Sequence, residues 1–174
     1  VICTDKTGTL TEGNMQVVRT DFKDRKQALL GLILANNQRT NLEAAIWDYL
    51  KKKEKINPQE TFDLAKRVYE EPFDSEKKYM MAISKIGDKE MSFILGAPEI
   101  VLSFSNEEKN NILAKIGEWA DDGLKVLGLA GKEKGDLKEK KEFSWLGLIA
   151  IEDPIRKEAK EAINTVLEAG IKVK

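Results

Sequence analysis

A stretch near the start of the chain carries the residue types that phosphoryl chemistry uses: it runs from Asp5 to Thr11 and reads Asp-Lys-Thr-Gly-Thr-Leu-Thr. It follows the apolar run Val1 to Thr4, which predicts a buried strand, so Asp5 is expected at a strand's carboxyl end, where open α/β sheets bind ligands. A carboxylate there can coordinate Mg²⁺ or attack phosphorus. Gly8 permits a tight turn, and the threonine hydroxyls can reach a phosphate. A strand followed by an ordinary polar turn is the alternative that so short a motif leaves open.

The composition excludes several other kinds of chemistry. The chain has no histidine, which rules out histidine-based triads and histidine metal sites. Its 29 basic and 30 acidic side chains leave a net charge of −1, whereas a sequence-independent nucleic-acid binder needs a clear positive excess. Cys3 is the one cysteine, so no intrachain disulfide can form, and this suits a reducing compartment. No apolar run approaches the roughly 18 residues of a membrane span.

Helices must position many of the residues that could carry this chemistry. The period of the apolar residues predicts where the helices lie. A capping-box match at Thr40 and Glu43 marks the start of the clearest one. A second match, at Ser105 and Glu108, precedes another helix. Asp153-Pro154 is expected to open the last helix. The predicted helices cover residues 26–36, 40–53, 58–68, 98–104, 106–122 and 154–169.

Strands are indicated between these helices. Residues 79–86 and 91–95 flank Gly87-Asp88-Lys89, which indicates a β-hairpin. Further strands are expected at residues 1–4, 15–20, 124–130, 143–151 and 171–173. The predicted fold class is therefore α+β, with an antiparallel sheet flanked by helices in the middle of the chain and α/β units at both termini, which are expected to meet in space.

The seven residues from Asp5 to Thr11 resemble the phosphorylation motif of the P-type ATPases, the ion pumps of the haloacid dehalogenase superfamily. Four further stretches are similar to motifs of that family and occur in the same order: Phe73 to Lys78, Gly96 to Glu99, Gly123 to Leu127 and Asp153 to Arg156. The resemblance covers nearly the whole chain. It implies a nucleotide-binding domain at residues 19–149, the N-terminal part of a phosphorylation domain at residues 1–18, and a hinge back into that domain at residues 150–174.

The resemblance also implies roles for individual residues. Asp5 would be the nucleophile that accepts the γ-phosphoryl group of ATP and becomes an aspartyl-phosphate, with Lys6 and Thr7 beside it. Asp5 and Thr7 would hold Mg²⁺. The residues expected to bind the nucleotide are Glu43, Phe73, Ser75, Lys78, Gly96, Lys125 and Arg156.

Several of these positions have a structural explanation as well. Phe73 stacks on adenine by the resemblance, but its neighbours also fit a core aromatic. Glu43 can be only half of the capping box. Asp153 and Arg156 can simply cap and decorate a helix, although the order of the motifs favours the hinge. Leu95 stands where the family commonly has lysine, and we expect this position to face the phosphates.

By this resemblance the chain is the ATP-binding part of a cation pump, a cytoplasmic domain of an integral membrane protein whose membrane segments bind the transported cation and are not in this sequence. A bacterial branch with members linked to calcium has a similar Leu-Gly-Ala-Pro string. We expect the fragment to bind adenine nucleotide without hydrolysing it. Two other functions stay open: a soluble haloacid dehalogenase phosphatase, although Thr7 occupies the place of its usual second aspartate, and a non-catalytic nucleotide-binding module, which would not need Asp5.

Overall fold

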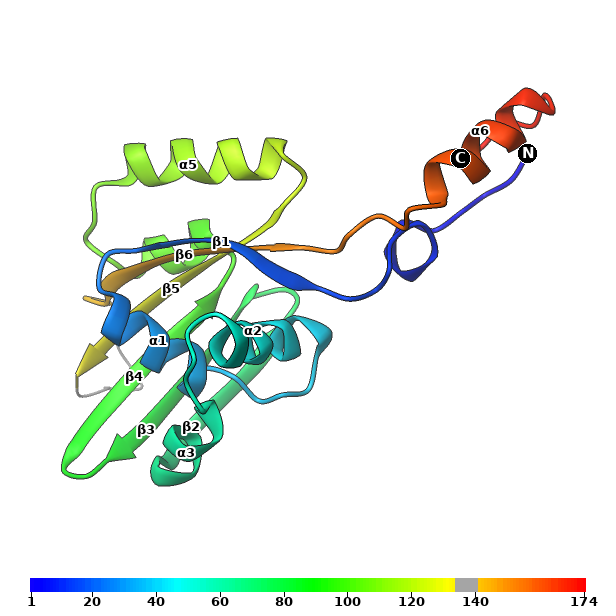
Figure 1. Ribbon diagram of the computed structural model, residues 1–174. Helices are drawn as coiled ribbons and strands as arrows, with labels where there is room; N and C mark the ends of the chain where they lie inside the picture. Colours follow the sequence, from blue (N-terminus) through cyan, green and yellow to red (C-terminus); the bar gives the residue numbers. More distant parts are fainter. Residues whose placement is uncertain (134–140) are drawn as a thin grey trace.

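The computed structural model describes residues 1–133 and 141–174, and an antiparallel sheet lies at its centre (Figure 1). Within this part of the chain the sheet has six strands in the order β1-β6-β5-β4-β3-β2. Each strand runs antiparallel to its neighbours. The strands are β1 (Gln16–Phe22), β2 (Lys66–Asp74), β3 (Tyr79–Ile86), β4 (Lys89–Gly96), β5 (Lys125–Glu133) and β6 (Ser144–Glu152).

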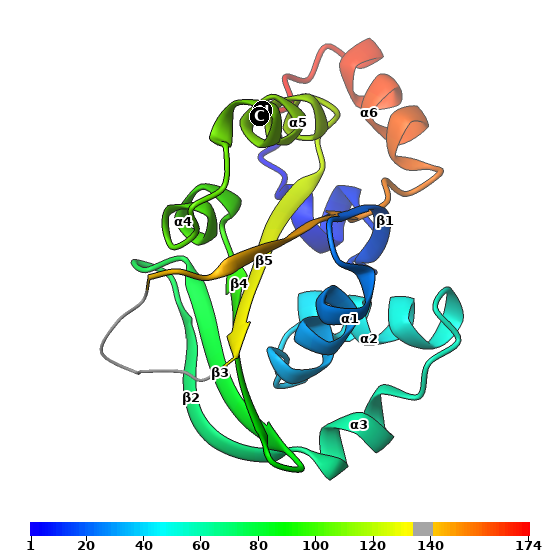
Figure 2. The same ribbon diagram turned by 90° about the vertical axis from the view of Figure 1, so that its left-hand side faces the viewer.

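Helices cover both faces of the sheet, as Figure 2 shows. Three helices, α1, α2 and α3, lie on one face, and α4 and α5 lie on the other. The last helix, α6, lies apart from the sheet, beside the first residues of the chain. The predicted class, an antiparallel sheet flanked by helices, is confirmed. The helices are α1 (Arg25–Leu34), α2 (Asn41–Lys52), α3 (Pro58–Leu64), α4 (Pro98–Ser103), α5 (Lys109–Asp121) and α6 (Ala159–Glu168).

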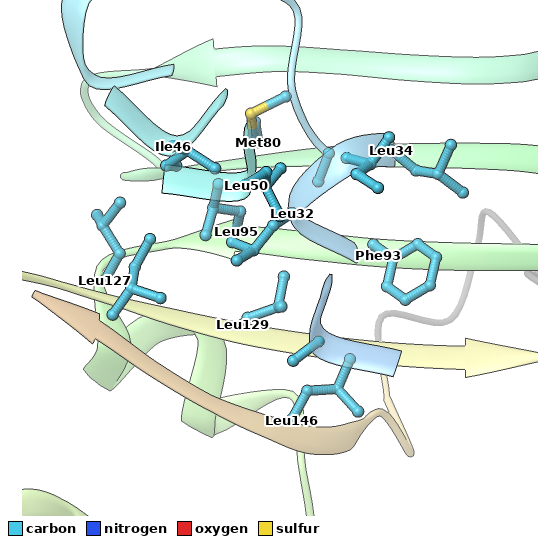
Figure 3. Close-up of a cluster of buried hydrophobic side chains, with 14 of the residues drawn as sticks. Leu32, Leu34, Ile46, Leu50, Met80, Phe93, Leu95, Leu127, Leu129 and Leu146 are labelled. Carbon is cyan, nitrogen blue, oxygen red and sulfur yellow. The ribbon is translucent and has the colours of Figure 1, made fainter. Parts of the chain in front are cut away.

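One part of the hydrophobic core fills the space between the sheet and the helices α1 and α2 (Figure 3). Leu32 of α1 and Ile46 and Leu50 of α2 are fully buried there, together with Phe93 of β4 and Leu129 of β5. Burying a side chain of this size stabilises the fold by about 1.5–3 kcal/mol. These leucine and isoleucine contacts hold α1 and α2 on the sheet.

A second core lies under α4 and α5 on the opposite face. Trp119 of α5 packs there with Trp145 and Leu148 of β6. Because helices cover both faces, the middle strands are mostly apolar, and all but the last two residues of β3 are buried. The middle of the sheet is therefore buried on both faces. Only the strand ends and turns can present groups to a ligand.

The capping box predicted at the start of α2 is present. The hydroxyl oxygen of Thr40 accepts a hydrogen bond from the backbone N of Glu43, and the Glu43 carboxylate accepts one from the backbone N of Thr40. The predicted hairpin is also present, since β3 and β4 pair up to Ile86 opposite Lys89. Both features depend on signals within a few residues of each other, which is why the sequence reveals them.

The sequence prediction missed one strand. It extends a helix through Val68, whereas α3 ends at Leu64 and β2 begins at Lys66. β2 lies at the edge of the sheet, and its pairing with β3 shifts register twice, between Arg67 and Tyr69 and again further along. Each shift breaks the alternation of inward and outward side chains, so β2 lacks the period of two that marks a strand in a sequence.

Two predicted helix starts are wrong. The second capping box does not form, because the Ser105 hydroxyl donates to the carbonyl of Leu102, and α5 begins after Glu108 without a side-chain cap. The last helix begins at Ala159 instead of Pro154, because the residues before it bond to the start of the chain.

The two ends of the chain meet, as the sequence predicts. The backbone N of Ile2 donates to the carbonyl of Lys172 at 2.8 Å, and the backbone N of Lys174 donates to the carbonyl of Ile2 at 2.9 Å. The two predicted end strands amount to one parallel bridge, between Ile2 and Val173. The predicted burial of the first strand is wrong, because Val1 and Ile2 are exposed. Figures 1 and 2 show both terminal segments leaving the sheet together. β1 and β6 cross the predicted domain boundaries after residues 18 and 149, and those boundaries stay predictions.

We predict that Gly31→Ala destabilises the fold although alanine favours helices. The Phe93 ring lies between two glycines: a Cβ at Gly31 would lie 2.8 Å from Phe93 Cδ1, and a Cβ at Gly131 would lie equally close. The ring therefore cannot retreat from a methyl group at Gly31. Overpacking costs about 1–3 kcal/mol, which exceeds the gain of up to about 1 kcal/mol in helix propensity.

The matched control for this prediction is Gly117→Ala in the middle of α5, where a Cβ would meet no atom within 4 Å. Urea unfolding should show a lower free energy of unfolding for Gly31→Ala and a higher one for Gly117→Ala. Equal stabilisation of both variants would contradict the tight packing at Phe93.

Candidate active site

The Asp5 loop, residues 5–11, is a tight turn that lies outside the sheet (Figure 1). Residues Lys6–Leu10 form one π-helical turn that begins after Asp5, and Asp5 Oδ1 accepts a hydrogen bond from the backbone N of Lys6 at 2.7 Å. Gly8 has a φ of 79°, which glycine adopts without strain. The side chains of Asp5 and Lys6 are exposed, and that of Thr7 lies outside the described residues. The Asp5 carboxylate is therefore accessible to a ligand.

Residues 153–156 hold the Asp5 loop from the other end of the sequence. Arg156 donates from Nε to the carbonyl of Thr9 at 3.0 Å and from Nη2 to the carbonyl of Gly8 at 3.3 Å. Asp153 Oδ2 accepts the hydroxyl of Thr11 at 2.6 Å. The structure thus brings together two of the predicted motifs, whose residues lie up to 148 positions apart. Arg156 contacts the loop here, and its contact with nucleotide stays a prediction.

Several of the predicted nucleotide-binding residues lie at one end of the sheet, which we call the hinge end. The register pairs Tyr79 with Gly96 and places Lys125 opposite Ile151. The same end holds the first residue of β1 opposite the last residue of β6, and these strands lead on to the Asp5 loop. The candidate nucleotide site therefore lies where the sheet meets the terminal segments.

A tight turn between β2 and β3 carries Ser75 and Lys78 to the hinge end. Asp74 Oδ1 accepts hydrogen bonds from the backbone N of Glu76 at 2.8 Å and of Lys77 at 2.9 Å. The bonds from Lys77 and Glu76 hold the pKa of the Asp74 carboxyl below its ordinary value. Lys78 takes a φ of 61°, which is unusual for a residue with a side chain. The ionised Asp74 thus fixes the turn that presents Lys78.

Gly96 is the point where this turn touches β4. A Cβ at Gly96 would lie 2.4 Å from the carbonyl oxygen of Lys78 and 2.5 Å from Tyr79 Cα, both of which are backbone atoms. Next to it, the backbone N of Ala97 donates to the same Lys78 carbonyl at 2.8 Å. Only glycine permits this approach, so Gly96 acts by leaving room for the turn.

The hinge end offers unpaired groups to a ligand. Phe73 is 62% exposed, which excludes the alternative of a core aromatic. Lys78 and Lys125 are exposed, and neither ammonium group has a hydrogen-bond or ion-pair partner among the described residues. Ser75 is exposed as well. An open aromatic face suits a base, and two unpaired cations suit phosphates.

Leu95 does not face this end, so the expectation that its position faces the phosphates is wrong. Its side chain is 3% exposed and lies in the core under α1 and α2 (Figure 3). A lysine at this position would place its ammonium group among leucines, which is costly without a partner.

Glu43 is held by its own loop. Its side chain is 7% exposed, and its carboxylate accepts hydrogen bonds from the backbone N of Asn37 at 3.0 Å, of Arg39 at 3.0 Å and of Thr40 at 2.9 Å. The Thr40 hydroxyl donates a further bond at 2.9 Å. These bonds explain why a carboxylate is tolerated in a buried position. A contact between Glu43 and nucleotide stays a prediction.

A polar network ties the Glu43 loop to β2, the strand that carries Phe73. Asn37 Nδ2 donates to Glu70 Oε1 at 2.8 Å, and Arg67 Nη2 donates to the carbonyl of Leu34 at 2.7 Å. Burial lowers the pKa of the Arg67 guanidinium, while the nearby Glu70 opposes that shift. Because the sequence did not predict β2, it gave no signal for this network.

Two further positions were missed as site residues. Asp74 lies inside a quoted motif, and its signal is an aspartate followed by backbone N–H groups two and three residues later, the pattern of an Asx turn. Thr11 closes the Asp5 motif, yet only the structure shows that its hydroxyl is buried against Asp153.

Two surface hollows lie away from the hinge end. One of about 410 Å³ lies beside Gln27, Gly131 and Trp145, far from the hinge end along the strands. Another, of about 470 Å³, runs along α6. Phe73 and Lys78 line neither of these two hollows.

The residues present fit Mg²⁺ in part. No group of three or more cysteine, aspartate and glutamate side chains that could hold a metal ion occurs within residues 1–133 and 141–174. Asp5 supplies one exposed carboxylate. Mg²⁺ in nucleotide sites commonly takes one or two carboxylates together with substrate phosphates and water. Asp5 therefore fits as one ligand of such an ion.

Comparisons with known proteins agree with these motifs. The family model described as the cytoplasmic domain N of the P-type ATPases matches residues 35–158. A probable cation-transporting P-type ATPase of Mycoplasma genitalium is 32% identical over 98% of this chain and 22% of its own length. Calcium-transporting ATPase 1 of Lactococcus lactis is 28% identical over 99% of this chain and 24% of its own length. The calcium-transporting ATPase of Bacillus subtilis is 27% identical over 99% of this chain and 26% of its own length.

This chain thus spans about a quarter of the length of the relatives it matches. In the part that the structure describes, no helix is long and apolar enough to cross a membrane. The matched region contains the strands β2 to β6 and the motifs at Phe73 to Lys78 and Gly96 to Glu99. The chain therefore belongs to the P-type ATPase family, and its residues 35–158 match that family's cytoplasmic domain N.

Proposed function

We propose that this chain is the ATP-binding part of a P-type ATPase that moves a cation across a membrane, with Asp5 as the phosphoryl acceptor. The observation that carries the proposal is the hinge end of the sheet, where Phe73 is exposed and Lys78 and Lys125 have no partner among the described residues. Cation transport is inferred from relatives that are named cation- or calcium-transporting ATPases, and calcium is the candidate ion.

In this proposal adenine stacks on Phe73, and the phosphates pair with Lys78 and Lys125. Stacking of a base on an exposed aromatic ring contributes about 1–3 kcal/mol. Ser75 and Gly96 belong to the turn and the strand end that place Lys78. Glu43 acts by holding the loop that is bonded to β2.

Asp5 attacks the γ-phosphorus, and the bond from that phosphorus to the bridging oxygen of ADP breaks, which leaves an aspartyl-phosphate and free ADP. Mg²⁺ bound by Asp5 and Thr7 would offset the negative charge that develops on the phosphoryl oxygens. Lys6 lies next to the nucleophile with an exposed side chain that can approach those oxygens. Arg156 holds the carbonyls of the loop.

Membership in the P-type family supports this function over a soluble haloacid dehalogenase phosphatase, because the matched region is the domain N of those ATPases. A non-catalytic nucleotide-binding module would share Phe73 and Lys78. It differs in having no use for an exposed aspartate that is held by a second segment of the chain.

We predict that Phe73→Ala weakens ATP binding by roughly tenfold or more, because the stacking contribution of about 1–3 kcal/mol is centred above the 1.4 kcal/mol that corresponds to one decade in affinity. The measurement is a calorimetric titration of the chain with ATP. Val68→Ala is the matched control, since Val68 is a 49% exposed apolar residue on the same strand.

Val68→Ala should bind ATP as the native chain does. An unchanged affinity in a folded Phe73→Ala protein would exclude the stacking role. Equal losses in both variants would instead show that the strand, not the aromatic ring, determines the affinity.

We also predict that this chain binds ATP without forming a phosphoenzyme. The Asp5 loop lies apart from the hinge end of the sheet in Figure 1, so a nucleotide bound at Phe73 is held away from the carboxylate. Phosphoryl transfer needs the acceptor in line with the phosphorus and cationic groups around it. The assay incubates the chain with Mg²⁺ and γ-labelled ATP and measures acid-stable, hydroxylamine-sensitive label.

No label is expected in samples that bind ATP by titration. Label at Asp5 with turnover would show that the loop reaches the nucleotide in this chain, and that the separation seen in the structure does not limit the reaction.

A further inference from the structure

The hydroxyl group of Thr11 is buried at the base of the Asp5 loop. Thr11 is 1% exposed. Its oxygen lies 2.6 Å from Asp153 Oδ2, 2.9 Å from the backbone N of Gly8 and 3.2 Å from the carbonyl oxygen of Lys6. The hydroxyl has one proton, so it can accept the bond from Gly8 and donate one bond, either to Asp153 or to Lys6.

The Thr11 hydroxyl donates its hydrogen bond to Asp153. A carboxylate accepts more strongly than a carbonyl, and the contact with Asp153 is shorter by 0.6 Å. The lone pairs of the hydroxyl oxygen are then free to accept the N–H of Gly8. Asp153 thereby sets the direction of both hydrogen bonds.

Arg156 binds the carbonyl groups of the same loop. It bonds to the carbonyls of Gly8 and Thr9, while its own backbone N donates to the carbonyl of Leu10 at 2.9 Å. Three consecutive carbonyls of the loop are thus paired, and the N–H of Gly8 is paired through Thr11. A carbonyl oxygen that turned toward a phosphoryl group would repel it, so this pairing keeps the loop suited to an anion.

The position of Asp153 lowers the stability of the fold. Its second oxygen, Oδ1, is buried and has no hydrogen-bond partner among the described residues. A buried acceptor without a partner lowers stability, and such groups commonly mark a functional constraint. The contact with Thr11 is the use of Asp153 that the structure shows.

We propose that Asp153 is a positioning residue for the phosphoryl acceptor: through the hydroxyl of Thr11 it fixes the N–H of Gly8, and with it the conformation of the loop that carries Asp5. This inference rests on the proposed role of Asp5. It assigns Asp153 and Thr11 to the transfer step and leaves nucleotide affinity to the hinge end of the sheet, where Phe73 and Lys78 lie.

Two substitutions at Thr11 separate hydrogen bonding from packing. Thr11→Val keeps the shape of the side chain and removes the hydroxyl, whereas Thr11→Ser keeps the hydroxyl and removes the methyl group. Asp153→Ala removes the acceptor. Thr165→Val on α6 is the control, because the Thr165 hydroxyl bonds within its own helix, to the carbonyl of Glu161.

The first measurement uses this chain and follows amide hydrogen exchange at Gly8 by NMR, with ATP affinity measured on the same samples. Thr11→Val and Asp153→Ala should speed exchange at Gly8 tenfold or more. Thr11→Ser and Thr165→Val should stay within about threefold of the native chain. ATP affinity should be unchanged in all four variants.

The second measurement places the same substitutions in the complete ATPase and follows the initial rate of acid-stable labelling from γ-labelled ATP. Thr11→Val and Asp153→Ala should lower that rate tenfold or more at unchanged apparent ATP affinity, and Thr11→Ser should retain most of it.

Native labelling and exchange in Thr11→Val would overturn the inference, as would equal losses in Thr11→Ser and Thr11→Val, which would indicate packing. If the unsubstituted ATPase takes no hydroxylamine-sensitive label at Asp5, the proposed function fails and this inference fails with it. The unsubstituted sample thus distinguishes the two failures.

Discussion

The pairing of β1 with β6 is the constraint on which the rest of the structure depends. These are the first and the last strands in the sequence, yet they are neighbours, and the first residue of β1 pairs with the last residue of β6. The close approach requires Gly147, which has a φ of 141° and whose Cβ would lie 2.2 Å from the carbonyl oxygen of Asp21. Because β1 begins where β6 ends, both terminal segments join the sheet at one place, and the Asp5 loop meets residues 153–156.

The same sheet limits where the proposed nucleotide site can lie. Helices fill both faces, so side chains in the middle of a strand point into a core, as Leu95 does at 3% exposure. Ligand groups can come only from strand ends and turns, and Phe73, Lys78 and Lys125 all occupy such positions. Gly96 adds the close backbone contact that keeps the turn in place.

The sequence predicts those parts of the fold whose signals are local. The box at Thr40 and Glu43 and the hairpin of β3 and β4 need only neighbouring residues, and both are present. β2 was missed because its register shifts hide the alternation, and its pairing with β3 is a tertiary matter. For the site, the family resemblance pointed to the candidate residues. No spacing in the sequence reveals that the Thr11 hydroxyl donates a hydrogen bond to Asp153, 142 positions away.

The connection between the sheet and the Asp5 loop limits how the two can move. If Asp5 takes the γ-phosphoryl group of a nucleotide bound at Phe73, the loop and the hinge end must approach each other, and the motion must occur in the two chain segments that join them. Those segments are tied by a hydrogen bond from the backbone N of Glu12 to the carbonyl of Pro154 at 2.9 Å. A single connecting segment could rotate about its own axis. Two segments joined by a hydrogen bond resist that rotation, so the connection favours a bending motion. Arg156 lies on the loop side of that bond, so its contacts travel with the Asp5 loop and preserve the loop's conformation while the distance to the nucleotide changes. Asp153 directly precedes Pro154, so its bond to Thr11 joins the base of the loop to the tied segments.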